Sequence, residues 1–374
     1  MVIKTRKLIY ASVFVFWLIS IAVKFNYNGL IYGLDFGLFH PDGKLYTFRT
    51  LIFLGNSELE AGTLVSDWYA SYAYKLKFFE PSSLYFDVHP LWQLYKPRVL
   101  YPILSVPFVA IFGIQGMLVV PALSMLVLLI SVFLIGIKVG NEKLAFLLVL
   151  ILSTSPVVNR WMFANITDGL LTAITCIFLV SLIYIKKPNL FLFVGSVLIF
   201  LGGYTRTSVV QWLAICIGIY LMNQKRNAII LGLISIISFI PSATGNLDSG
   251  ILPNEQKGSL LERPIQLVGS MLKVGFYELG QLLVLDRILL FLLGLSVLLS
   301  VINVSRTSSK LLLLTFSALW ITGAVNGTIG VNFRYQLPLL PFVAYSILDC
   351  SKFNFAILNN ANPFKRRNKA SLVD

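Results

Sequence analysis

Two acidic side chains stand in short polar segments that border long apolar runs. Asp42 lies between Pro41 and Gly43 in GLDFGLFHPDGKLY, and Asp168 opens an apolar run in FANITDGLL. One carboxylate at such a place can act as a general base on an acceptor hydroxyl, while a second orients the acceptor or a metal ion. Each also has a plainer interpretation, because Asp42 suits a tight turn and Asp168 suits the first turn of a helix.

Three arginines occupy comparable positions, namely Arg98 in YKPRVLYP, Arg206 in GGYTRTS and Arg334 in NFRYQLPLLP. Singly, each is typical of an anchor that keeps its charge at the membrane surface. Converging on one phosphate, they would form the multi-donor clamp that a lipid phosphate requires. Further side chains that would contact a substrate there are His40, Tyr46, Lys96 and Tyr335, although a turn residue is the simpler interpretation of His40.

Composition indicates that membrane helices must position these residues. The 374-residue chain is 57% hydrophobic and only 12% charged, whereas soluble domains carry about 25% charged residues. A span needs about 20 apolar residues, so the sequence predicts an all-α integral membrane fold with about ten transmembrane helices. The predicted spans are 8–24, 117–138, 144–160, 169–186, 189–205, 208–222, 227–241, 287–304, 311–330 and 335–350.

The distribution of charge predicts the orientation. Basic pairs such as Lys186 with Lys187 and Lys225 with Arg226 fall at every second connection, as the positive-inside rule requires when both termini are cytoplasmic. Most of the formal net charge of +14 then lies on the cytoplasmic side. The excess is therefore a topology signal together with attraction to membrane lipids, and nucleic acid is excluded as a partner.

Segment 98–114 is apolar, short and interrupted by two prolines, and counting it as a span would invert every later basic cluster. We predict that it is an interfacial or re-entrant helix on the external face. Residues 1–350 then form one transmembrane domain, and 351–374 form a basic cytoplasmic tail. The external loops are 25–116 and 242–286, with amphipathic interfacial segments at 44–54, 64–79 and 264–285.

The order of these parts resembles the GT-C superfamily of membrane glycosyltransferases, in particular the protein mannosyltransferase and aminoarabinose transferase group. The carrying motifs are the early loop with Asp42, the IFG of 111–113, the turn in LSTSPVVNRWMFANITDGLLTAI and the FRYQLPLLPF near the end. The resemblance implies a polyprenyl-phosphate sugar donor, Asp42 as catalytic base and Asp168 as the second acidic residue. This chain has PDG and a lone Asp where the family has acidic pairs, so a divalent cation is not required by the sequence and the metal stays unassigned.

The expectation is thus an inverting glycosyltransferase of the plasma membrane, with its active site on the external face and a glycan, lipid or protein as acceptor. Three alternatives are a transporter or flippase for lipid-linked substrates, a polysaccharide polymerase or ligase, and a non-catalytic scaffold. A transporter should carry ionisable residues at mid-depth in its helices, and a polymerase or ligase should carry its largest loop late in the chain. The predicted spans here contain almost no ionisable residues at mid-depth, and the largest loop follows the first span, so the sequence favours neither alternative.

Overall fold

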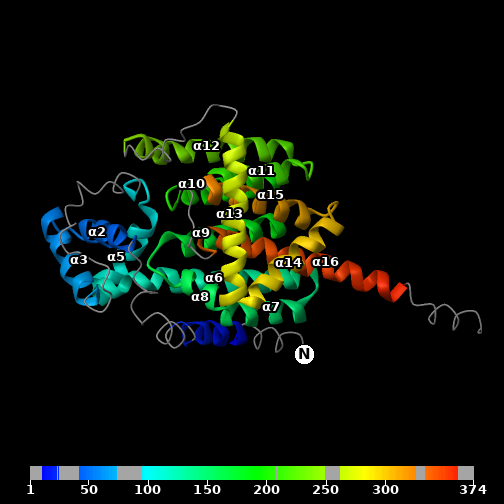
Figure 1. Cartoon of the computed structure of the whole chain (residues 1–374), viewed down its shortest axis with the longest axis horizontal. Helices are drawn as coiled ribbons and strands as arrows, with labels where there is room; N and C mark the ends of the chain where they lie inside the picture. Colours follow the sequence, from blue (N-terminus) through cyan, green and yellow to red (C-terminus); the bar gives the residue numbers. More distant parts are fainter. Residues whose placement is uncertain are drawn as a thin grey trace, which may run out of the picture.

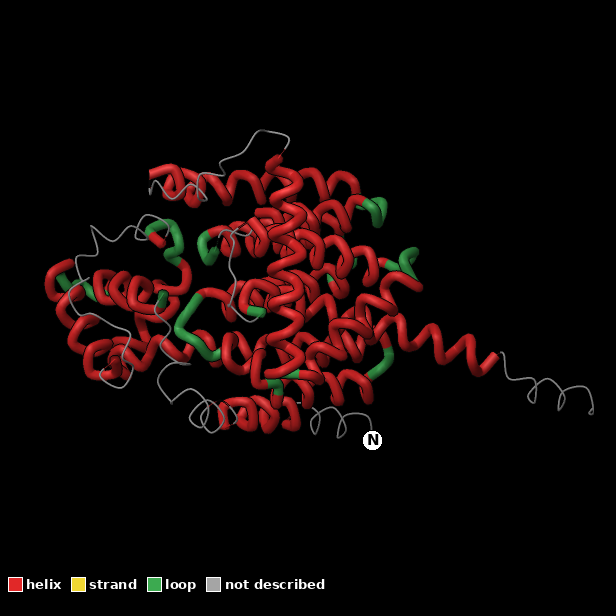
Figure 2. The backbone as a smooth tube through the Cα atoms, in the orientation of Figure 1, coloured by secondary structure: helices red, strands yellow, loops and turns green. Residues whose placement is uncertain are grey.

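The computed structural model describes residues 11–22, 24, 42–73, 95–206, 209–248, 262–325 and 333–360. This part of the chain is all-helical, and Figure 2 shows helices joined mostly by short loops. Every range predicted as a span contains a helix. The bundle comprises the helix Ala11–Ala22, α6 (Val119–Val139), α7 (Glu142–Thr154), α8 (Pro156–Met162), α9 (Thr167–Tyr184), α10 (Pro188–Gly203), α11 (Val209–Tyr220), α12 (Lys225–Asp248), α14 (Arg287–Ile302), α15 (Thr307–Val325) and α16 (Leu340–Asn360).

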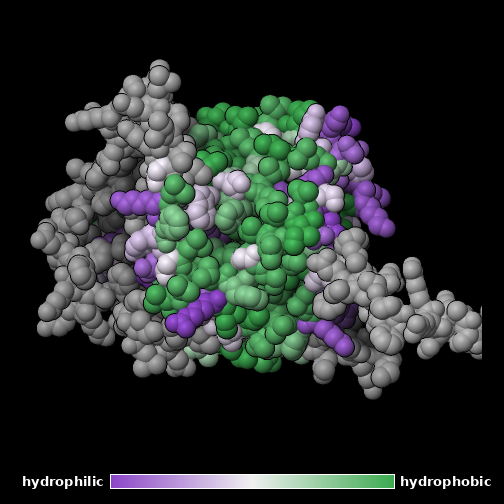
Figure 3. All heavy atoms as spheres, turned by 45° about the vertical axis from the view of Figure 1, so that its right-hand side comes forward, coloured by the Kyte–Doolittle hydropathy of each residue, from purple (hydrophilic) through white to green (hydrophobic). Residues whose placement is uncertain are grey.

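The described helices differ in whether they are long enough to cross a bilayer. Two helical runs, Leu100–Val139 and Thr167–Tyr184, are long and apolar enough, and the bent pair of α7 and α8 is a third if it counts as one span. Large apolar side chains nevertheless cover the outside of the bundle, for example Phe193 and Phe291. Figure 3 shows a broad hydrophobic belt with hydrophilic residues gathered toward two sides. Such a belt is typical of a surface in contact with lipid.

The predicted span 144–160 is not one straight helix. It divides into α7 and α8, which meet at an angle of 69°. Ser155 has extended backbone angles, as the residue before a proline prefers, and its hydroxyl caps α8 by accepting from the N–H of Val158 at 3.1 Å. The Ser155 hydroxyl also donates to the carboxylate of Asp286, which caps α14. Ser155, at the break, therefore links the start of α8 to the start of α14.

A second group of helices stands beside the bundle. It comprises α2 (Gly43–Phe53), α3 (Glu58–Ala73) and α5 (Leu100–Phe112), with α2 packed on both others (Figure 1). The 3₁₀ helix η2 (Gly113–Leu118) joins α5 to α6. The chain turns back at Gly113, whose φ is 64°: η2 packs on α5, and the hydroxyl of Tyr101 donates to the backbone carbonyl of Met117 at 2.7 Å. Helix α5 therefore does not continue straight into α6.

Two elements complete the fold. Helix α13 (Glu262–Leu285) crosses the bundle helices on the near side of Figure 1 and packs against α15, α14 and α8. It coincides with the predicted amphipathic segment 264–285. The 3₁₀ helix η3 (Arg334–Leu339) leads into α16, which continues to Asn360, so the helix extends beyond 350, where the tail was predicted to begin.

Candidate functional site

The guanidinium group of Arg334 joins the two acidic residues singled out from the sequence. Its Nη2 atom lies 2.7 Å from Oδ2 of Asp42, and its Nε atom lies 3.0 Å from Oδ2 of Asp168. Arg334 begins η3, directly after Phe333, whose backbone is left-handed with φ of 69°. One planar side chain thus bridges the start of α2 and the start of α9.

Asp168 is completely buried and lies between two arginines. Its second carboxylate oxygen, Oδ1, forms an ion pair with Nη1 of Arg206, from the turn between α10 and α11. The guanidinium carbon of Arg206 lies 3.9 Å from the centre of the Tyr335 ring. Asp168 is in the first turn of α9, where a negative charge is favourable. Its carboxylate is nevertheless directed at arginines, so helix capping does not account for it.

Asp42 is the more accessible carboxylate, with 23% of its side chain exposed. It holds the N-cap position of α2, yet its side chain makes no capping hydrogen bond. The next residue is Gly43, and a Cβ atom there would collide with the side chain of Asn165. Glycine therefore permits the start of α2 to press against the turn that carries Asp168.

Arg98 reaches the same cluster through Tyr46 of α2. Its Nη1 atom donates to the hydroxyl of Tyr46 at 3.3 Å, and that hydroxyl lies 3.2 Å from Oγ1 of Thr167 at the start of α9. Burial opposes the charge of Arg98, but the hydroxyls of Tyr46 and Tyr95 and the carboxylate of Asp42 outweigh it and raise the pKa of Arg98. Among the described residues no carboxylate forms an ion pair with Arg98.

The cluster carries an excess of positive charge, since three guanidinium groups face two carboxylates. Burial lowers the pKa of Arg206 to about 10; the Tyr335 hydroxyl opposes this shift, and the charges of Arg334 and Arg98 add to it. Arg206 therefore remains charged at neutral pH. A buried set of cations that outnumber their carboxylate partners favours the approach of an anion.

The structure brings together most of the residues selected from the sequence. Asp42, Asp168, Arg98, Arg206 and Arg334 form one connected network, with Tyr46 and Tyr335 in contact with its arginines. Tyr46 is almost fully buried, so it links α2 to α9 rather than facing outward. Lys96 is exposed and makes none of these contacts. His40 lies outside the described residues.

Sequence reasoning missed Glu278, a buried residue of α13. Its Oε2 atom accepts a hydrogen bond from the backbone N–H of Phe333 and so holds the left-handed turn that precedes Arg334. Trp161 was also missed; its ring centre lies 5.7 Å from the guanidinium carbon of Arg334. The one sequence signal for Glu278 is a lone acid in the amphipathic segment 264–285, far from any turn motif.

In the part of the chain that is described, no three His, Cys, Asp or Glu side chains gather as metal ligands would. The carboxylates of Asp42 and Asp168 instead contact arginines. The acidic side chains of the network are thus paired with guanidinium groups. Comparison with protein-family models, curated proteins and solved structures finds no match to this chain.

Proposed function

We propose that this protein is an inverting membrane glycosyltransferase that moves a sugar from a polyprenyl-phosphate donor to an acceptor hydroxyl. The observation that carries the proposal is the network of two aspartates and three arginines at the junction of α2, α9 and η3. These side chains come from segments up to 292 residues apart. A buried network of this kind, at the ends of apolar helices, is a site for charged chemistry at a membrane surface.

Asp42 has the general-base role in this proposal. It is the more accessible member of the pair, and one of its oxygens is held by Arg334. The other oxygen would take the proton of the acceptor hydroxyl as that oxygen attacks the anomeric carbon. The bond from this carbon to the phosphate oxygen breaks at the same time, on the opposite face of the sugar, which inverts the configuration.

Asp168 has a positioning role instead, because complete burial removes it from contact with an acceptor. It holds Arg206 and Arg334 side by side and compensates part of their charge. The leaving polyprenyl phosphate carries a charge that Arg98, Arg206 and Arg334 would stabilise. Preorganised cations that meet a developing negative charge account for large rate effects without reorganisation.

The proposed topology has about ten transmembrane helices, cytoplasmic termini and an external site. Support comes from the apolar belt and from the basic pairs at every second connection. On this arrangement the group of α2, α3 and α5 lies outside, above the ends of the spans. The bilayer is a plasma membrane, and the acceptor is a glycan, a lipid or a protein.

The test is a transfer assay on the full chain in lipid nanodiscs, with polyprenyl phosphates that carry different radiolabelled sugars. We expect wild type to transfer one of them and Asp42→Asn to lose at least about 100-fold in rate, as removal of a general base does. Asp67→Asn is the matched control, because Asp67 is an exposed acid on α3. Thermal unfolding establishes that each variant is folded.

Two outcomes would overturn the proposal. Full transfer activity in a folded Asp42→Asn variant would remove the base. Movement of lipid-linked sugars between leaflets, with no transfer from any donor, would favour the transporter instead.

A further inference from the structure

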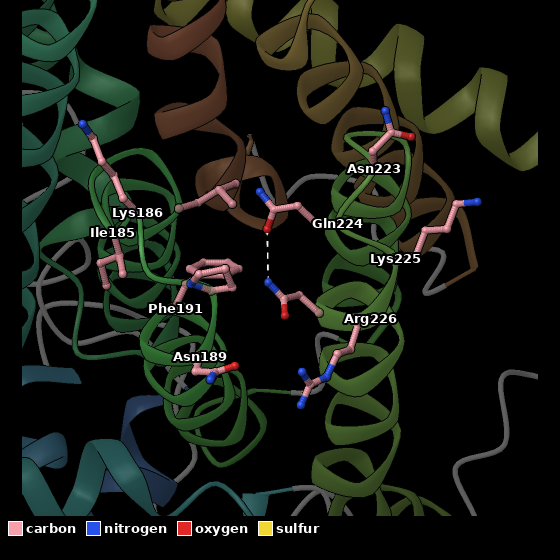
Figure 4. A pocket seen from close by; sticks show the side chains of 11 residues that line it. Ile185, Lys186, Asn189, Phe191, Asn223, Gln224, Lys225 and Arg226 are labelled. Carbon is pink, nitrogen blue, oxygen red and sulfur yellow. Dashed lines mark hydrogen bonds between the residues drawn. The ribbon is translucent and has the colours of Figure 1, made fainter.

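A second polar site lies at the far end of α9. A cavity of about 400 Å³ opens where α9 ends and where α10 and α12 begin (Figure 4). Its polar lining includes Asn189 from α10, Gln224 from the residue just before α12, and Arg226 and Asn227 from the first turn of α12. Leu182, Ile185 and Phe191 form its apolar lining.

The segments that line this cavity carry cations and no acidic residue. Lys186, Lys225 and Arg226 all line it, and the sequence contains no Asp or Glu between Asp168 and Asp248. In Figure 4, Arg226 extends across the opening toward Asn189, whereas Lys186 and Lys225 extend outward from the rim. Arg226, Asn189 and the two lysines are exposed at the mouth of the cavity, and a guanidinium, lysines and an amide donor gathered at one opening suit an anion.

The site is separate from the aspartate–arginine network. Asp168 lies in the first turn of α9, whereas Leu182 and Ile185 belong to its last turn and C-cap. An 18-residue helix is about 27 Å long, close to the thickness of a hydrocarbon core. The two polar sites therefore lie at opposite faces of the apolar layer.

The N-terminal ends of two helices at this cavity also favour an anion. Helices α10 and α12 pack side by side and both begin at this cavity. Their positive N-terminal ends add to the field of the three cations. The amide groups of Asn227 and Gln224 hydrogen bond to each other at 3.2 Å, which fixes the cavity wall.

We propose that this cavity binds a phosphate group, with Arg226 as its main cation and the amide of Asn189 as a second donor. The source of the phosphate is either the headgroup of an anionic phospholipid or a soluble phosphate ester. Apolar contacts at Leu182, Ile185 and Phe191 would accommodate the glycerol and acyl start of a lipid. The proposal does not depend on glycosyl transfer.

The experiment uses the full chain in a detergent micelle and measures binding by native mass spectrometry and by thermal shift. The probes are phosphatidylglycerol, zwitterionic phosphatidylcholine and glycerol 3-phosphate. The test variant is Arg226→Gln with Lys186→Gln. Its control, Lys143→Gln with Lys187→Gln, removes the same charge from exposed lysines that do not line the cavity.

Removal of two cations near a phosphate should weaken its binding about tenfold or more. A loss of phosphatidylglycerol binding in the test variant alone supports the site with a lipid occupant. The same pattern with glycerol 3-phosphate supports it with a soluble one. Equal loss in both variants, equal binding of phosphatidylcholine and phosphatidylglycerol, or no binding of any probe would overturn the proposal.

Discussion

The Nη2 atom of Arg334 lies 2.7 Å from Oδ2 of Asp42, although 292 residues separate the two in the chain. The same guanidinium group reaches Asp168 through Nε. A planar fork can meet two carboxylates at once, whereas a lysine ammonium is a single point of charge. The geometry of the site therefore depends on arginine rather than on positive charge alone.

Arg334→Lys should keep the charge and lose one of the two contacts. The lost charge-assisted hydrogen bond is worth about 1.5–3 kcal/mol, so transfer activity should fall about 10- to 100-fold. The nanodisc transfer assay measures this directly. Arg287→Lys is the control, because Arg287 is exposed at the start of α14. Equal activity of wild type and Arg334→Lys would show that bridging is not needed.

Asp168→Asn should destabilise the fold, because it leaves Arg206 and Arg334 without their shared buried partner. Removal of one member of a buried ion pair costs about 3–5 kcal/mol. The measurement is unfolding in mixed micelles with increasing SDS. A double-mutant cycle with Arg206→Gln provides the check, since coupled residues give non-additive changes. Additive losses would mean that the two side chains do not interact.

Glu278→Ala should disturb the site from a distance. The backbone N–H of Phe333 would lose its buried acceptor, at a cost of about 1–3 kcal/mol in the free energy of unfolding, and Arg334 would be displaced. Glu278→Gln retains an acceptor oxygen and should keep most stability and transfer activity. If the glutamine variant is as impaired as the alanine variant, the charge of Glu278 and not its hydrogen bond is what matters.

Lys44 on α2 should make stability depend on pH. Partial burial lowers the pKa of Lys44 to about 8, below the value of about 10.4 in an unfolded chain. Between these values the unfolded state binds more protons, so the free energy of unfolding rises as pH increases from about 8 to 10.4. Below pH 8 the ammonium group of Lys44 is charged in the folded state although it is partly buried, and this lowers the free energy of unfolding.

Lys44→Gln should therefore raise the melting temperature at pH 7 and lose this advantage near pH 10.5. Thermal unfolding of both proteins at pH 7, 9 and 10.5 measures the difference. Lys96→Gln serves as the control, because Lys96 is exposed. A constant difference across this pH range would contradict the prediction.

Much of this arrangement follows from local sequence patterns. Asp42, Asp168, Arg206 and Arg334 were selectable because each stands at the end of an apolar run, where charge is unusual. The helices of the bundle likewise follow from hydropathy, and Pro156 marks the break between α7 and α8. The choice of ion-pair partners did not follow, because which carboxylate meets which arginine depends on packing between distant segments.

The role of Glu278 also could not be predicted from local sequence. Its partner is a backbone N–H that lies 55 residues further along the chain, and its own segment carries no turn or motif. Hydropathy identified α13 as an amphipathic helix but could not identify the residue that α13 contributes to the site. The packing of α13 across the bundle depends on distant segments, and no local sequence pattern predicts it.

The late position of Arg334 has a consequence for biogenesis. Domains fold progressively from the N-terminus during synthesis, and Asp42, Asp168 and Arg206 are all made well before Arg334. Until Arg334 has been made, Asp168 has only Arg206 as a partner within the network, and Asp42 and Asp168 are not joined. The bridge between Asp42 and Asp168 therefore cannot form until the segment that carries Arg334 has been made.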